Sequence, residues 1–167
     1  HHRGILQDRM ASVSISLEQS SELRVLVQPS EKETVVQENL LALIHRHNLQ
    51  DRIAIEDYTG MVTSEMLRYD FIFHPSRFES FGYVPAEAMS VKVPVIASHE
   101  GGLKEVVDLE TGFVSLENTA ESYFEIFKKI YAGSPSLACK IDLAFNKVKR
   151  TFSKEIMIKN IEEVYYK

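Results

Sequence analysis

The stretch DFIFHPSRFESFGYVPAEAMSVKVPVIAS, residues 70–98, decides the fold of this chain. Its two ends, 70–74 and 94–98, are apolar at nearly every position, which is typical of strands that are covered on both faces. The residues between them predict a short helix at 84–91. A strand, a helix and a second strand in this order indicate one unit of a parallel sheet.

The same alternation of short apolar runs and helical patterns extends along the chain. It predicts an α/β domain with a Rossmann-like parallel sheet and helices on both faces. Residues 4–20 predict a helix, whereas a Rossmann-like domain normally opens with a strand, so we expect the first strand of the domain to be absent from this chain. Further strands are predicted at 23–28, 52–56 and 112–116, and further helices at 31–48, 59–69, 102–108, 119–132, 136–150 and 153–166.

Length and composition narrow the class of protein. The 167 residues are the size of one domain, and 44% hydrophobic with 26% charged residues is typical of a globular protein with a core. A net charge of −5 argues against non-specific nucleic-acid binding. No apolar run approaches the roughly 18 residues of a membrane span, and no secretory signal opens the chain. Cys139 is the only cysteine, which excludes an intrachain disulfide and fits a cytoplasmic location.

The loop that follows strand 70–74 has the features of an anion site. Ligands of parallel sheets gather at the carboxyl ends of the strands, where this loop begins. Gly82 lets the backbone turn close to a ligand, and Pro85 suits the first position of a helix. The amides near 83, 84 and 86 would then face outward at the positive end of the helix, which favours a phosphate or diphosphate.

Two glutamates flank this turn. Glu79 and Glu87 have seven residues between them, and each could accept hydrogen bonds from paired hydroxyls, Glu87 from a ribose and Glu79 from a second polyol. Each also has a structural interpretation, because a glutamate in a first helical turn stabilises the helix dipole and a loop glutamate is usually solvated. The strand end, the glycine turn and the helix start favour the ligand interpretation for the pair.

At this point the chain resembles a known family. PSRFESFGYVPAEAM, residues 75–89, is similar to the donor-binding loop of the family 4 glycosyltransferases, which are retaining enzymes of the GT-B fold. Their pattern is P-S-x-x-E-x-F-G-x-x-x-x-E-A-M. PVIASHEGGLKEVVDLETGFVSL, residues 94–116, is similar to the P-V-I-A and G-G-x-x-E-V-V segments of the family, and 151–167 is similar to its closing helix.

The resemblance implies roles for individual residues. Glu87 would bind the ribose hydroxyls of a sugar nucleotide, and Glu79 would hold hydroxyls of the transferred sugar. Arg3 would be the second half of a basic pair that grips the phosphates, with a solvated terminal arginine as the alternative. The base would lie near 56–58. The residues expected to contact the donor are Ser80, Phe81, Gly82, Tyr83, Val84, Glu87 and Arg3.

The resemblance also implies a reaction. A nucleotide-sugar-binding domain over 1–167, with an N-terminal acceptor domain that is absent, would transfer a hexose from a nucleotide diphosphate to an acceptor hydroxyl without a metal. The acceptor would be a glycan or glycolipid in polysaccharide or glycolipid biosynthesis, reached at the cytoplasmic face of a membrane through the absent half. The isolated domain is expected to be inactive.

Several features depart from this pattern or allow another reading. Lys92 stands where the family often has glycine, and QPSEK, residues 28–32, replaces its G-D-G-P. His74 and His99 lie near the ligand edge, where histidines are more often structural. Residues 101–103 form either a second anion site or a turn that packs on the donor loop. A non-catalytic scaffold and a generic nucleotide-binding Rossmann-like domain are the alternative functions.

Overall fold

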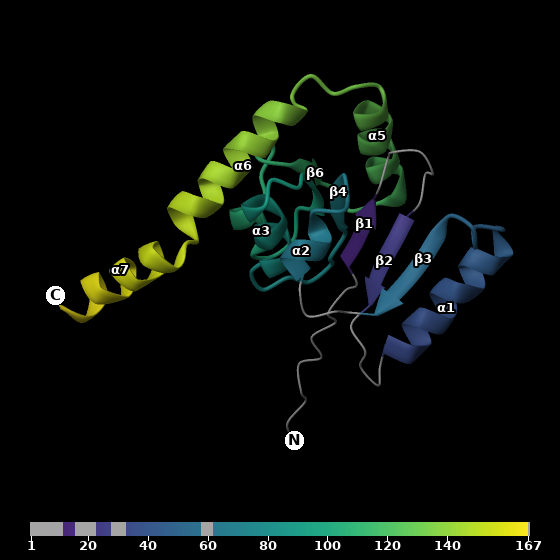
Figure 1. Ribbon diagram of the computed structural model, residues 1–167, viewed down its shortest axis with the longest axis horizontal. Coiled ribbons are helices and arrows are strands. Elements are labelled where there is room, and N and C mark those ends of the chain that lie inside the picture. The colour runs from purple at the N-terminus through teal and green to yellow at the C-terminus, as the bar shows by residue number, and fades with distance from the viewer. Residues whose placement is uncertain (1–11, 16–22, 28–32, 58–61, 167) are drawn as a thin grey trace.

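The computed structural model describes residues 12–15, 23–27, 33–57 and 62–166. These residues form a sheet with the strand order β3-β2-β1-β4-β5-β6 and seven helices (Figure 1). The strands are β1 (Ser12–Ile15), β2 (Leu23–Val27), β3 (Ile53–Asp57), β4 (Phe71–His74), β5 (Val95–Ser98) and β6 (Phe113–Ser115). The helices are α1 (Glu33–Arg46), α2 (Val62–Met66), α3 (Tyr83–Ser90), α4 (Leu103–Val106), α5 (Ala120–Tyr131), α6 (Leu137–Thr151) and α7 (Lys154–Tyr165).

The sheet is parallel except at one strand. β2 pairs with β3, β4 with β5 and β5 with β6 in parallel, which confirms the Rossmann-like prediction, whereas β1 runs antiparallel to both of its neighbours. The predicted helix over 4–20 is wrong at 12–15, which form β1, and the rest of that range lies outside the described residues. The reason is local: Val13 and Ile15 alternate with serines, a two-residue period that suits a strand, and β2 and β4 both offer ladder groups to pair with.

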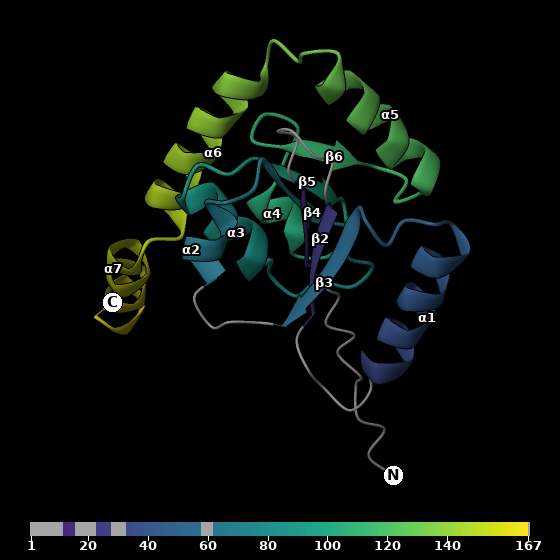
Figure 2. The same cartoon turned by 45° about the vertical axis from the view of Figure 1, so that its right-hand side comes forward.

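Helices cover both faces of the sheet, as Figure 2 shows with the sheet seen nearly edge-on. Successive side chains of a strand point to opposite faces, so neighbours in β4 and β5 enter two separate cores. Ile72 and Val95 join the core under α2, α3, α4 and α6, while Phe71 and Ile96 join the core under α5. This two-sided burial explains why the strands are apolar at nearly every position.

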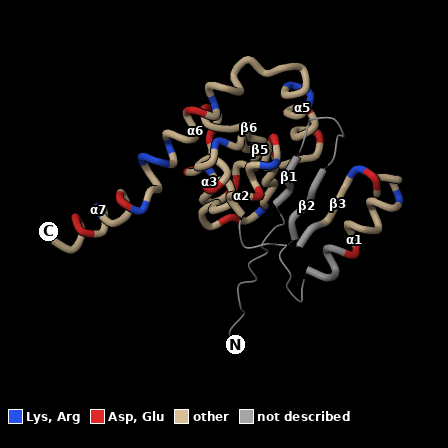
Figure 3. Tube along the Cα trace, in the orientation of Figure 1, with Lys and Arg blue, Asp and Glu red and all other residues tan. Residues whose placement is uncertain are grey.

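Capping residues set the start of two helices after the sheet. The side chain of Thr119 accepts a hydrogen bond from the Ser122 amide at the start of α5, and Ser153 accepts one from Ile156 at the start of α7. Both basic and acidic residues occur along α5, α6 and α7 (Figure 3). None of the described helices is both long and apolar enough to cross a bilayer.

Candidate functional site

The loop between β4 and α3 is held at the carboxyl edge of the sheet by the neighbouring strands. The hydroxyl of Ser98, at the end of β5, donates a 2.6 Å hydrogen bond to the carbonyl oxygen of Ser76. Ser76 is buried, and its own hydroxyl donates to the carbonyl oxygen of Phe78 at 3.0 Å. The loop therefore leaves the sheet along a fixed path.

The glycine pair after β5 packs directly on this loop. The Gly102 amide donates a 2.9 Å hydrogen bond to the carbonyl oxygen of Glu79. A Cβ at Gly101 would overlap that same oxygen, and a Cβ at Gly102 would overlap the carbonyl oxygen of Ser80. Of the two readings of 101–103, the turn that packs on the loop is confirmed, since the four-residue helix α4 that follows is too short to gather a helix dipole.

Gly82 makes the turn into α3. Its φ of 104° lies in the left-handed region, and a Cβ there would lie 2.8 Å from a methyl group of Leu103. Both observations confirm the predicted need for glycine. The helix begins at Tyr83, one residue before the predicted start at 84, so Pro85 is its third residue and not its first. Proline is tolerated there because the first turn needs no intrahelical donor.

The earlier start of α3 changes which amides are free. The Ala86 amide donates to the Gly82 carbonyl oxygen at 3.1 Å, so the prediction that it faces a ligand is wrong. The amides of Tyr83 and Val84 lie in the first turn, where no intrahelical acceptor exists. These two groups are the candidates for binding an anion at the helix start.

Glu79 is more than a solvated loop residue. One carboxylate oxygen, Oε2, lies 3.1 Å from Nε2 of His74, and Oε1 accepts from the Phe81 amide at 3.4 Å. The Glu79 side chain is 24% exposed, and His74 is buried. Burial lowers the pKa of His74 and outweighs the opposing effect of Glu79, so the imidazole is neutral near pH 7.

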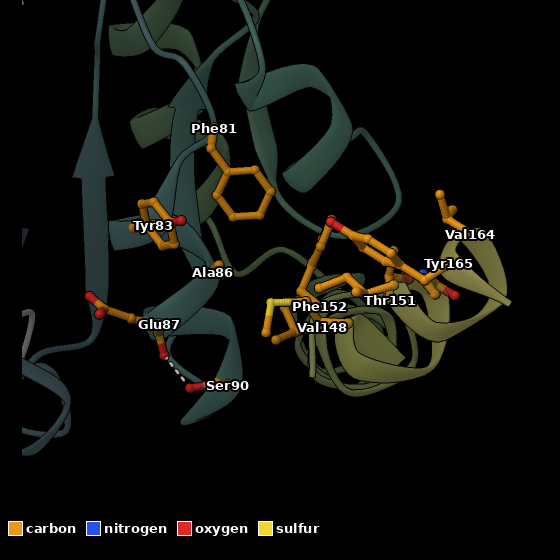
Figure 4. Close-up of a pocket in the computed structure, with 13 residues that line it drawn as sticks. Phe81, Tyr83, Ala86, Glu87, Ser90, Val148, Thr151, Phe152, Val164 and Tyr165 are labelled. Carbon is orange, nitrogen blue, oxygen red and sulfur yellow. Dashed lines mark hydrogen bonds between the residues drawn. The ribbon is translucent and has the colours of Figure 1, made fainter. Parts of the chain in front are cut away.

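Glu87 lies one residue further into α3 than predicted, which places it just beyond the first turn. It is the fifth residue of the helix, and no acidic residue lies in the first turn. The helix-dipole interpretation is thereby weakened, because that effect falls off within one turn. Glu87 is half-buried, and this partial removal from water raises the pKa of its carboxyl group. In Figure 4 the carboxyl group points away from the side chains of α7.

An apolar groove of about 680 Å³ lies beside the loop (Figure 4). The ring of Phe81 packs edge-on against Phe152 at 5.2 Å between centroids and lies 4.9 Å from the ring of Tyr83. Residues of α3, α6 and α7 complete the walls. The lining residues are Phe81, Tyr83, Ala86, Glu87, Ser90, Val148, Thr151, Phe152, Met157, Asn160, Ile161, Val164 and Tyr165.

The other predicted site residues fall into three groups. Ser80 is exposed, and the Tyr83 side chain is 72% exposed beside the groove. Val84 turns its side chain toward the core, which leaves only its backbone to meet a ligand. Arg3 and Tyr58 lie outside the described residues.

In the part of the chain that the structure describes, no three His, Cys, Asp or Glu side chains are grouped to hold a metal ion.

One residue that supports the site gave no signal in the sequence. Asn118, which follows β6, has a φ of 51° and donates from its side-chain amide to the Ser76 carbonyl oxygen at 3.2 Å. Its side-chain oxygen accepts a 2.7 Å hydrogen bond from the Tyr123 hydroxyl. Asn118 thus ties α5 to the loop after β4 across 42 residues of sequence, which no local pattern predicts.

The comparisons with known proteins agree with this fold. The family described as glycosyl transferases group 1 matches residues 22–141. The lipopolysaccharide core biosynthesis mannosyltransferase LpsB of Rhizobium meliloti (strain 1021) is 26% identical over 125 residues, which cover 73% of this chain and 36% of LpsB. The alpha-1,3/1,6-mannosyltransferase alg-2 of Neurospora crassa is 33% identical over 96 residues, 56% of this chain and 20% of that protein. The chain thus spans about a third or less of these curated relatives.

Solved structures show the same half of a larger fold. HepE of Anabaena in complex with UDP superposes with a TM-score of 0.78 and 22% identity, covering 84% of this chain and 40% of HepE. The C-terminal domain of the group 1 protein LpcC from Francisella tularensis superposes with a TM-score of 0.66 and 19% identity, covering 75% of this chain and 66% of that domain. The likeness identifies the fold as the Rossmann-like half of GT-B proteins.

Proposed function

The chain belongs to the group 1 glycosyl transferases, as the C-terminal half of their GT-B fold, and from that membership we propose that it binds a nucleotide-diphosphate sugar. Together with an N-terminal acceptor domain, it transfers the sugar to an acceptor hydroxyl with retention of configuration. The acceptor is a glycan or glycolipid at the cytoplasmic face of a membrane. The one observation that carries the proposal is the placement of Glu79 and Glu87 on either side of the Gly82 turn at the carboxyl edge of the sheet.

Each end of the donor has a matching group. Glu87 is partly removed from water, so hydrogen bonds from the ribose hydroxyls would replace the hydration that it lacks. The diphosphate lies against the amides of Tyr83 and Val84 at the positive end of α3. Glu79 receives hydroxyls of the sugar. Arg3 adds a cation for the phosphates.

The chemistry follows from these positions. Departure of the nucleotide diphosphate builds negative charge, which the preorganised amides stabilise. The acceptor attacks the same face of the sugar, and the leaving phosphate takes its proton. Neither glutamate acts as a general acid or base, and both position the donor. HepE, which shares this fold, was solved with UDP bound, which supports a nucleotide donor for this chain as well.

A thermal-shift titration with UDP, GDP and ADP tests the proposal. We expect one of these nucleotides to raise the melting temperature of the chain, because a ligand that binds only the folded state stabilises it. Glu87→Ala should abolish that rise while the variant stays folded. Glu38→Ala, which removes an exposed glutamate on the remote helix α1, serves as the control and should keep the rise.

The alternative functions predict other results. A scaffold or non-catalytic partner would show no stabilisation by any of the three nucleotides. A generic nucleotide-binding domain would be stabilised by them but would gain nothing further from a sugar on the diphosphate. Transfer itself is expected to be negligible for this chain alone, because the acceptor domain supplies the other side of the cleft.

A further inference from the structure

His74 and Glu79 form a pair that the function described above does not yet use. His74 is the last residue of β4, is 3% exposed, and places Nε2 at 3.1 Å from Oε2 of Glu79. The other ring nitrogen, Nδ1, is buried and meets no hydrogen-bond partner among the described residues. A buried polar atom without a hydrogen bond costs free energy. Nδ1 therefore does not explain why an imidazole lies here, and the contact of Nε2 with Glu79 is the interaction to consider.

The contacts decide where the proton of the imidazole lies. A carboxylate only accepts hydrogen bonds, so Nε2 must carry the proton that is shared with Glu79. Nδ1 then keeps its lone pair, because a proton there would be buried without an acceptor. His74 is therefore a neutral donor that points at one oxygen of Glu79.

The carboxylate of Glu79 is fixed at both oxygens. Oε2 receives the imidazole proton, and Oε1 receives the more distant Phe81 amide at 3.4 Å. Each oxygen of a carboxylate has room for two hydrogen bonds, so one position on each remains open. The side chain is 24% exposed, so these positions are reachable from solvent.

We propose that His74 is a positioning residue, which holds the Glu79 carboxylate so that its open positions receive the hydroxyls of the transferred sugar. The proposal rests on the function proposed above, in which Glu79 binds the sugar and Glu87 binds the ribose. It follows that loss of the imidazole lowers the affinity for the sugar part of the donor and leaves the affinity for the nucleotide part unchanged. If His74 only stabilised the fold, its loss would change both affinities alike.

The experiment compares two affinities in the full 167-residue chain. Calorimetry measures binding of the nucleoside diphosphate that raises the melting temperature most, and binding of its glucose and mannose conjugates. We expect His74→Leu to lower the affinity for the sugar conjugate by about tenfold, the loss expected for one hydrogen bond to a charged group, and to leave the affinity for the diphosphate within twofold. His74→Gln, which can place an amide donor near the same point, should recover most of the loss.

Two controls locate the effect. Glu79→Gln should lower the affinity for the sugar conjugate as His74→Leu does, and adding His74→Leu to it should cause no further loss, because the two residues act as one unit. Equal loss for both ligands, or no loss for either, would overturn the proposal. If the wild-type chain binds the sugar conjugate no more tightly than the diphosphate, the proposal for His74 is also overturned. The proposed binding of a nucleotide would not be affected by that result.

Nitrogen NMR of the imidazole gives a readout that needs no ligand. We expect His74 to be neutral at pH 7 with its proton on Nε2. A proton on Nδ1 would overturn the pairing, whether or not a nucleotide binds. Failure of the wild-type chain to bind any nucleotide or conjugate, by contrast, would overturn the proposed function.

Discussion

The amide of Gly102 and the carbonyl oxygen of Glu79 are joined by a 2.9 Å hydrogen bond between two loops that follow neighbouring strands. This bond places the segment after β5 against the segment after β4, with no room for a side chain between them. The position of Glu79 therefore depends on residues more than twenty positions away in the sequence. The backbone of the candidate site is built by two loops and not by one.

Gly102→Ala tests this contact. Gly102 has a φ of −68°, which alanine adopts without strain, so the only penalty is the overlap of the new Cβ with the Ser80 carbonyl oxygen. We expect the free energy of unfolding to fall by about 2 kcal/mol or more, and nucleotide binding to weaken. Gly133→Ala is the control: its Cβ meets no described atom within 4 Å, and its φ of 83° costs about 1 kcal/mol. Equal urea midpoints for the two variants would contradict the prediction.

Glu87→Gln should stabilise the domain while it removes nucleotide binding. Burial raises the pKa of this carboxyl above its ordinary 4.5, so the folded state loses stability as the pH rises from below 4.5 through the raised pKa. At pH 7 the uncharged amide should raise the free energy of unfolding by up to about 1 kcal/mol, a modest value because the group is partly solvated. At pH 3.5 the difference should vanish. Urea unfolding at both pH values measures this, and a destabilised variant at pH 7 would contradict it.

Asp108→Asn should remove a source of acid sensitivity. Burial alone would raise the pKa of Asp108, but hydrogen bonds from Lys147 (2.7 Å), from Thr111 and from the Glu110 amide lower it to about 2. The stabilisation is therefore complete above pH 3.8 and is lost as the pH falls through about 2. Since the side chain is 41% exposed, we expect a loss of only about 1 kcal/mol at pH 7.

The measurement for Asp108 is urea unfolding at pH 7, 3 and 2. The variant should lose less stability than wild type between pH 4 and 2. Asp142→Asn is the control, because Asp142 pairs with Lys92 in an exposed position and should change stability by no more than a few tenths of a kcal/mol. Parallel pH curves for wild type and Asp108→Asn would show that the carboxylate does not stabilise the fold.

Lys92→Gly should stabilise the chain. Lys92 follows α3 with a φ of 62°, so it adopts the left-handed conformation that favours the glycine often found there in the family. Glycine relieves about 1 kcal/mol of backbone strain. The lost contacts with Asp142 (2.9 Å) and with the ring of Phe145 (5.2 Å) are exposed and contribute less. Lys92→Ala keeps the strain and loses the contacts, so it should be less stable than wild type; urea unfolding that ranks it above Lys92→Gly would refute this account.

Local patterns were sufficient for most of the fold. The strands β2 to β6 and all seven described helices lie where hydrophobic periodicity predicts them, because their apolar residues recur with the period of the element that they form. β1 is the exception: its alternation at 12–15 spans only four residues and lies within a longer, weak helical pattern. Its antiparallel pairing depends on the edges of β2 and β4, which are set by the rest of the sheet.

The sequence by itself determined the α/β class, the glycine turn at Gly82 and the two glutamates around it, since these follow from side-chain period, backbone freedom and spacing along the chain. Only the tertiary structure decided three hydrogen bonds. His74 bonds to the Glu79 carboxylate, the Gly102 amide donates to the Glu79 carbonyl oxygen, and Asn118 donates to the Ser76 carbonyl oxygen in the loop after β4. The physical reason is that hydrogen bonds across strands depend on distances in space, which the order of residues does not record.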